Sequence, residues 1–213
     1  MDQPKIDYSK KALEEILTFK GGRPSLLLHS CCGPCSTHPL CYLAPHFEIT
    51  FYYGNSNIFP KEEYLHRLEE QKKFLSYFER DFGYHVSLVV PPYDHEAYME
   101  DLRPLADCRE GGERCHLCYK KRMEEAYAYA SDQGFEYFAT LMTVSRQKDS
   151  QILNRLGEEL SKAYPKTKYF FSDFKKDDGN AIGNRLAASY GLYRQNYCGC
   201  EYSIYSKEDG KGD

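Results

Sequence analysis

The feature that most constrains this chain is a short apolar run that leads directly into three cysteines. Residues 25–35 have the sequence SLLLHSCCGPC. An apolar run of this length predicts a buried strand, and Pro34 suits the first turn of a following helix because its φ is fixed near the helical value. In an open α/β sheet, ligands bind beyond the carboxyl ends of the strands. The sequence therefore predicts a thiol-rich site at the end of its first strand.

The distribution of the other cysteines argues against a disulfide framework. Nine cysteines are present, and those outside the first group are Cys41, Cys108, the pair Cys115 and Cys118, and the pair Cys198 and Cys200. Disulfide frameworks scatter an even number of cysteines and need an oxidising compartment. The first residues contain no apolar segment of the kind found in a secretory signal. We therefore expect a cytoplasmic protein whose clustered thiols bind metal or do redox work.

Composition narrows the possible partners. The chain is 41% hydrophobic and 28% charged, as in ordinary globular proteins, and its net charge of −4 gives no global signature of nucleic-acid binding. Any contact with nucleic acid would have to use a local basic patch. The candidates for such a patch are Lys120, Lys121, Arg122, Arg146 and Arg155. No apolar stretch approaches the roughly 18–20 residues of a membrane span, so we expect no membrane contact.

The order of predicted elements indicates an α/β fold. Strands are predicted at 25–30, 47–53, 85–90, 135–142 and 168–171, and helices at 8–20, 34–45, 60–82, 114–131, 149–163 and 180–190. Such alternation predicts a doubly wound, mostly parallel, Rossmann-like sheet of five strands. We expect one domain over 1–213, with a core at about 24–203 and a polar tail at 204–213. If the strand order reverses beside the first strand, the loops with Cys31–Cys35 and Ser145–Asp149 flank one crevice.

The cysteine groups allow three kinds of chemistry. Thiolates bind iron–sulfur clusters and zinc, and Cys115 and Cys118 would share one face of a helix. A zinc-stabilised nucleic-acid-binding domain could use these two with Cys32 and Cys35, although the adjacent Cys31 is unusual for a zinc site. A thioredoxin-like oxidoreductase could use Cys32 and Cys35, because that motif also follows a strand and precedes a helix. The second pair and the chain length count against this alternative.

Two further groups are candidates for catalysis. Cys198 and Cys200 flank a single glycine, and a disulfide across so short a span would be strained and labile. We therefore interpret this pair as a redox-active dithiol or as a source of additional ligands, and the alternative is a pair of exposed tail cysteines with no role. Asp94, Asp149 and Asp173 each follow a predicted strand, where a carboxyl group could bind metal or donate a proton. Each of them could equally begin a helix as an N-cap.

Several motifs together resemble a known family. They are LHSCCGPCS at 28–36, YGNSNI at 53–58, RCHLCY at 114–119, LMTVS at 141–145 and GLYRQNYCGC at 191–200. In this order they resemble the cobalamin-independent epoxyqueuosine reductases, over about residues 24–203. The resemblance implies reduction of epoxyqueuosine to queuosine at the wobble position of tRNA. It also implies a fold similar to the adenine-nucleotide alpha hydrolases, without their ATP chemistry.

The resemblance also implies cofactors, partners and residue roles. The implied partners are the tRNA anticodon loop and an external electron donor. The implied cofactors are a [4Fe-4S] cluster and a second, mononuclear metal, iron. The implied cluster ligands are Cys31, Cys32, Cys115 and Cys118. The implied redox-active pair is Cys198 and Cys200. For the second metal, held by cysteines and an aspartate, the candidates include Cys35 and Asp94, and Asp149 is the candidate catalytic acid.

Overall fold

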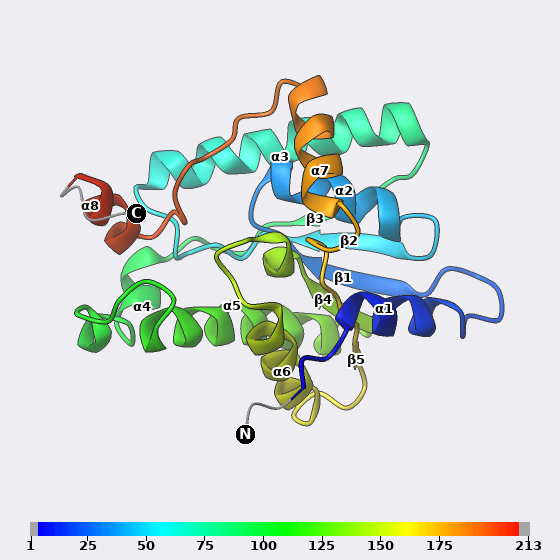
Figure 1. The fold of residues 1–213 in the computed structure, drawn as a ribbon, viewed down its shortest axis with the longest axis horizontal. Coiled ribbons are helices and arrows are strands. Elements are labelled where there is room, and N and C mark those ends of the chain that lie inside the picture. Colours follow the sequence, from blue (N-terminus) through cyan, green and yellow to red (C-terminus); the bar gives the residue numbers. More distant parts are fainter. Residues whose placement is uncertain (1–3, 209–213) are drawn as a thin grey trace.

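The computed structural model describes residues 4–208 and contains a five-stranded sheet between two layers of helices (Figure 1). Its strands, in the spatial order β3-β2-β1-β4-β5, are β1 (Ser25–His29), β2 (Glu48–Tyr52), β3 (Ser87–Val89), β4 (Tyr137–Thr140) and β5 (Lys168–Tyr169). Every neighbouring pair is parallel. The predicted doubly wound parallel sheet is confirmed. The strand order reverses beside β1, so the loops after β1 and β4 lie at one switch point.

Helices cover both faces of this sheet (Figure 1). The helices are α1 (Tyr8–Ile16), α2 (Gly33–Leu43), α3 (Lys61–Phe82), α4 (His95–Met99), α5 (Glu113–Asp132), α6 (Ser150–Ser161), α7 (Gly179–Ser189) and α8 (Glu201–Glu208). Helix α2 packs against α3 and α7 on one side, and α5 packs against α6 on the other. No helix within residues 4–208 is both long and apolar enough to cross a bilayer.

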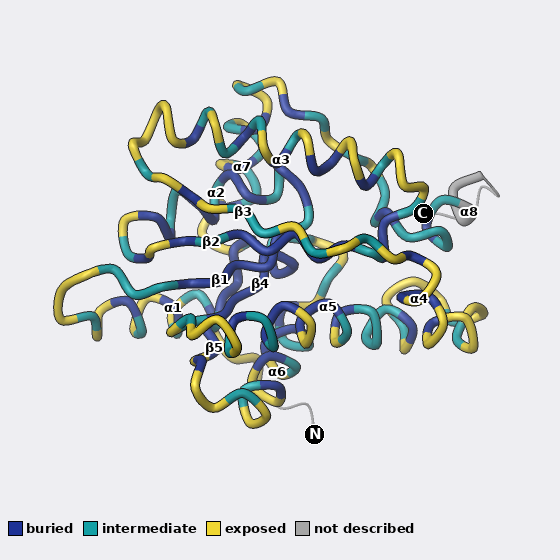
Figure 2. Tube along the Cα trace, turned by 180° about the vertical axis from the view of Figure 1, so that it is seen from behind, coloured by how far each residue is buried: buried dark blue, intermediate teal, exposed yellow. Residues whose placement is uncertain are grey.

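The central strand explains the continuous apolar run in the sequence. Leu26, Leu27 and Leu28 are all fully buried. Leu26 and Leu28 belong to the core cluster that includes residues of α2 and α3, whereas Leu27 belongs to the cluster under α5. A strand covered on both faces has no solvent side, and therefore needs no polar alternation. Figure 2 shows the buried strands in the middle of the molecule and the exposed outer faces of the helices around them.

The structure also corrects several predicted boundaries. The first helix ends at Ile16 rather than near residue 20. The fourth strand stops at Thr140 because a 3-10 turn, Leu141–Val144, follows it, with the Thr140 hydroxyl accepting a hydrogen bond from the Met142 N–H at 3.2 Å. Residues 94–112, for which the sequence predicted neither a helix nor a strand, contain α4 and a short 3-10 turn, Arg103–Leu105. Helix α8 occupies part of the expected polar tail, and residues 209–213 lie outside the described range.

Candidate metal and thiol site

Three cysteines form a tight group where β1 leads into α2. The sulfur atoms of Cys31, Cys32 and Cys35 all lie within 4.8 Å of one another, and the Cys31 and Cys32 sulfurs are 3.9 Å apart. Two sulfurs bound to one tetrahedral zinc ion at about 2.3 Å would be separated by roughly 3.8 Å. The spacing of the adjacent pair therefore suits one soft metal ion. We call these residues the cysteine triad.

The protein backbone brings the cysteine triad close to helix α3. A side chain at Gly33 would place its Cβ 2.7 Å from the carbonyl oxygen of Glu70, so glycine is needed for this approach. Pro34 lies in the first turn of α2, as the sequence predicts. Cys32 occupies the N-cap position of α2 and makes no side-chain capping hydrogen bond there. The loop and helix therefore hold the three sulfurs ready to bind metal.

Hydrogen bonding divides the charge unequally within the triad. Hydrogen bonds from Cys32 and Cys35 lower the pKa of Cys31 well below its usual value, and the cations Arg122 and Lys148 lower it further. The hydrogen bond to Cys31, together with burial, raises the pKa of Cys32 to about 12. Hydrogen bonds to Cys31 and Cys32, together with burial, raise the pKa of Cys35. Within the triad, these interactions favour the thiolate at Cys31 and the thiol at Cys32 and Cys35. A metal ion would displace the remaining protons on binding.

The second pair of cysteines lies on helix α5 and is not part of this tight group. Within the described residues, the triad is the one group of three or more potential metal ligands whose donor atoms all lie within 4.8 Å of one another. Cys115 accepts a hydrogen bond from the Gly111 N–H at 3.2 Å, and Cys118 accepts one from the Tyr98 hydroxyl at 3.1 Å. Burial raises the pKa of both thiols. The predicted four-cysteine ligand set therefore stays a prediction.

A buried arginine interacts electrostatically with both cysteine groups. Arg122 is 3% exposed and donates a hydrogen bond to the side-chain oxygen of Asn55 at 2.6 Å. Its charge favours the thiolate of Cys31 and partly offsets the effect of burial on Cys118. The sequence analysis placed Arg122 in a surface patch for phosphate, and this was wrong because its guanidinium is buried among the thiols.

The third cysteine pair belongs to a segment near the end of the chain. Residues 193–203, here called the tail segment, run from α7 along α3 to α8 (Figure 1). The Cys198 sulfur lies 3.9 Å from the Lys148 ammonium group. A hydrogen bond from Cys200 lowers the pKa of Cys198 well below its usual value, as does the charge of Lys148, while the same interaction raises the pKa of Cys200. The negative charge of Cys198 raises the pKa of Cys118 in turn.

The tail segment also contacts the cysteine triad directly. The Gln195 side-chain amide donates a hydrogen bond to the Cys32 sulfur at 3.1 Å. Nearby, the Tyr193 ring stacks on His66 with the ring centroids 4.2 Å apart. These contacts and electrostatic interactions link the three cysteine groups, which come from distant parts of the sequence, at one end of the sheet. Sequence reasoning did not identify Gln195, because only the folded chain brings it to the triad.

The three candidate aspartates each have a structural contact. Asp94 caps α4 by accepting a hydrogen bond from the Ala97 N–H at 3.1 Å. Asp149 caps α6 by accepting one from the Gln151 N–H at 2.8 Å. Asp173 is buried and accepts a hydrogen bond from a serine hydroxyl at 2.7 Å. Asp94 and Asp149 therefore act as helix N-caps, and their predicted roles in metal binding and catalysis stay predictions.

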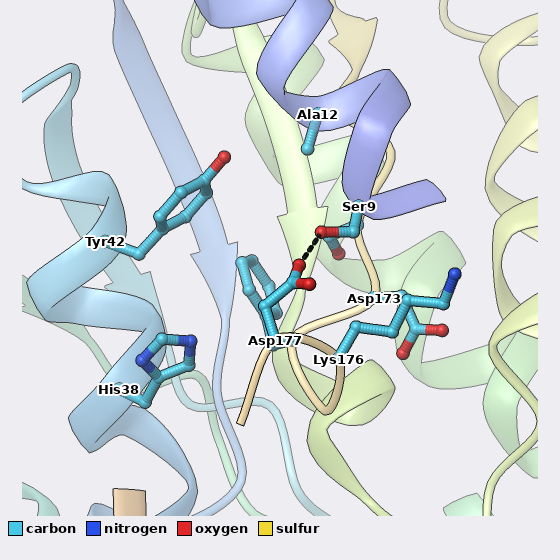
Figure 3. A pocket seen from close by; sticks show the side chains of 9 residues that line it. Ser9, Ala12, His38, Tyr42, Asp173, Lys176 and Asp177 are labelled. Atoms are coloured by element: carbon cyan, nitrogen blue, oxygen red, sulfur yellow. Dashed lines mark hydrogen bonds between the residues drawn. The ribbon is translucent and has the colours of Figure 1, made fainter. Parts of the chain in front are cut away.

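A separate small pocket lies between α1, α2 and the loop after β5 (Figure 3). Its volume is about 80 Å³, and its lining includes His38, Tyr42 and Asp177. Ser9 donates a hydrogen bond to Asp177 across its edge at 2.5 Å. None of the cysteines lines it, and ligand pockets usually exceed about 300 Å³. This pocket is therefore a poor alternative to the thiol site.

The parallel sheet and the thiols at its switch point define an α/β protein equipped for metal or thiol redox chemistry. The family model described as Epoxyqueuosine reductase QueH matches residues 26–206. The chain belongs to this family, and the predicted resemblance is confirmed.

Curated relatives with the same description cover most of the chain. The Streptococcus pyogenes protein is 39% identical over 93% of this chain and 78% of its own length. The Staphylococcus aureus protein is 38% identical over 95% of this chain and 86% of its own length. The Staphylococcus epidermidis protein is 36% identical, with 95% and 87% coverage. The chain is therefore an oxidoreductase, as predicted.

Proposed function

We propose that this protein reduces the epoxide of epoxyqueuosine at the wobble position of tRNA to the alkene of queuosine. The observation that carries the proposal is the cysteine triad at the sheet switch point, together with the half-buried dithiol of the tail segment, in a chain of this family. The anticodon loop suits such a site because its bases are unpaired and reachable. Neither a nucleic-acid-binding zinc domain nor a thioredoxin-like enzyme accounts for all three cysteine groups.

The donor atoms fit the metals that we propose. Buried thiolates are the ligands of iron–sulfur clusters and of other soft metal sites. Cys31, Cys32, Cys115 and Cys118 would hold a [4Fe-4S] cluster, and Cys35 with Asp94 would contribute to a second iron site. When bound, these groups would supply single electrons and a Lewis acid for the epoxide oxygen. The triad sulfurs lie within 4.8 Å of one another, so the proposed second-site ligand Cys35 lies beside two of the proposed cluster ligands.

The dithiol can balance the reaction in electrons and protons. Conversion of an epoxide to an alkene and water consumes two electrons and two protons. Oxidation of Cys198 and Cys200 to a disulfide releases two electrons and two protons, and an external electron donor would then reduce the disulfide. Lys148 favours the thiolate of Cys198 by its charge. Asp149 remains the proposed proton donor, at the start of the helix after Lys148.

The tRNA contacts would have to be local, because the protein has a net charge of −4. Lys120, Arg146 and Arg155 are exposed and remain candidates for phosphate contacts. Lys121 pairs with Asp101, which reduces its availability. Phosphate contacts would position the RNA, and recognition of the modified base would depend on the thiol site.

The first test measures metal content and activity. We expect anaerobically purified protein to be brown, to contain iron and labile sulfide, and to convert epoxyqueuosine-containing tRNA, with nucleoside mass spectrometry as the assay. Cys115→Ala should lose cluster iron and activity while its fold survives. Cys41→Ala is the matched control, since Cys41 packs against the core outside the three groups.

Two outcomes would contradict the proposal. Colourless wild-type protein with tightly held zinc would favour the zinc-domain alternative. Iron at wild-type stoichiometry in Cys115→Ala would remove Cys115 from the ligand set.

A further inference from the structure

A buried arginine of α3 contacts the turn that contains the proposed redox dithiol. The Arg67 side chain is 2% exposed. Its Nη1 donates a hydrogen bond to the carbonyl oxygen of Cys198 at 3.1 Å, and its guanidinium lies over the Tyr197 ring at 5.1 Å from the centroid. No motif of the sequence pointed to this residue, which lies 131 positions before Cys198.

The turn fits directly onto this guanidinium group. Gly199 has a φ of +108°, and a Cβ at this position would lie 2.8 Å from Arg67 Nη1. On the other side of the turn, the Phe59 N–H donates a hydrogen bond to the Gly199 carbonyl oxygen at 2.8 Å. The backbone between the two cysteines is therefore held at consecutive carbonyl groups.

The arginine is itself held in a fixed orientation. Its Nε donates a hydrogen bond to Glu63, one helical turn earlier, at 2.7 Å. The Glu63 side chain is 11% exposed, so the ion pair is shielded from solvent. Charge-assisted hydrogen bonds in buried surroundings are strong and directional. One face of α3 thus presents a rigid group to the tail segment.

We propose that Arg67 is a positioning residue that holds the Cys198–Gly199–Cys200 turn in its dithiol conformation and thereby sets the redox equilibrium of the pair. This inference depends on the redox role proposed above for the two cysteines, which the structure describes as free thiols. Stabilising the reduced form of a dithiol makes its disulfide easier to reduce. The contacts of Arg67 with the turn would therefore favour reduction of the disulfide back to the dithiol by an external electron donor.

The test measures the thiol–disulfide equilibrium of this pair with glutathione. One oxidised glutathione and the dithiol give the protein disulfide and two reduced glutathiones, so the exchange is balanced. Cleavage after Arg194 and Lys207 yields a peptide, residues 195–207, that contains only these two cysteines. After acid quenching and alkylation of metal-loaded protein, mass spectrometry of this peptide gives the oxidised fraction at each glutathione ratio.

We expect Arg67→Met to raise the equilibrium constant for oxidation about tenfold, because the charge-assisted contact to the dithiol turn is lost. Arg67→Lys should give an intermediate value, since it retains the charge but not the planar fork. Arg80→Met is the matched control on the same helix: Arg80 is exposed and pairs with Asp81, away from the thiols. If Arg67→Met fails to fold, Glu63→Gln combined with Arg67→Met removes the unpaired carboxylate as well.

The possible outcomes distinguish the role of Arg67 from the redox function of the dithiol. A wild-type pair that oxidises, with an unchanged equilibrium constant in folded Arg67→Met or the double variant, overturns the role of Arg67 alone. A wild-type pair that remains reduced at every glutathione ratio overturns the proposed dithiol function and the present inference with it. An equal change in Arg80→Met would show a general effect of α3 and would also overturn the specific role.

Discussion

At the scale of single residues, Lys148 has an electrostatic role that its position in a loop does not reveal. In the sequence, nothing links a lysine in the loop after the fourth strand to a distant cysteine. In the structure its ammonium group lies 3.9 Å from the Cys198 sulfur, and its backbone carbonyl accepts a hydrogen bond from Lys175 at 3.0 Å. This contact fixes the loop while the side chain points toward the thiols. The chemistry of Cys198 therefore depends on a residue 50 positions away.

We predict that Lys148→Met shifts the reactivity of Cys198 toward higher pH. The Lys148 cation favours the thiolate and lowers the pKa of Cys198, so its removal raises that pKa and leaves less thiolate at neutral pH. Alkylation of Cys198 by iodoacetamide, followed on peptide 195–207 across a pH series, should become several-fold slower near neutrality. Arg146→Met, an exposed neighbour in the same loop, is the control. An unchanged pH profile in Lys148→Met would contradict the prediction.

At the scale of elements, the sequence predicted what depends on local periodicity. Apolar patterns such as the run at Leu26–Leu28 and the regular apolar face of α3 predicted the strands and the long helices in the right order. Helix α4 was missed because five residues are too few to show a helical period, and its cap at Asp94 was one of several possible interpretations. The triad was predictable because its cysteines are adjacent in sequence. The contact of Arg67 with Cys198 was not, because only tertiary packing brings them together.

Helix α6 gives a test that separates structure from catalysis at one residue. Asp149 caps this helix, so Asp149→Ala should lower the free energy of unfolding by about 1 kcal/mol, as measured by urea denaturation. Asp149→Asn should retain stability close to wild type, because asparagine caps helices as well as aspartate does. Equal stability losses in both variants would contradict the capping role.

The asparagine variant also tests the proposed proton donor. Asparagine cannot donate the proton of a carboxylic acid, so a loss of epoxide reduction in folded Asp149→Asn would support the catalytic role predicted from the sequence. Full activity would leave Asp149 with the capping role alone.

At the scale of the whole molecule, the tail segment contacts helices on both sides of the carboxyl end of the sheet. On the α3 side, the Tyr193 N–H donates a hydrogen bond to Glu70 at 2.6 Å. On the α4 and α5 side, Glu201 lies 3.3 Å from His95, and the Arg114 guanidinium lies over the Tyr202 ring at 4.1 Å. The buried apolar side chains of the core include those of the central strands but none from residues 193–203. We therefore expect the tail segment to open locally without unfolding of the sheet.

The connection from Gln195 to Cys32 couples this opening to metal binding. A metal ion at the triad would fix the Cys32 sulfur, to which Gln195 donates its hydrogen bond, and would thus favour the closed segment. We predict that amide hydrogen exchange across 195–203 is several-fold slower in metal-loaded than in metal-free protein, while the exchange of β1 remains slow in both. Gln195→Leu should reduce the difference in the tail segment without loss of metal. If loading protects β1 but leaves the exchange of 195–203 unchanged, the tail segment is not coupled to the metal site, and the dithiol turn must be ordered by its contacts with α3 alone.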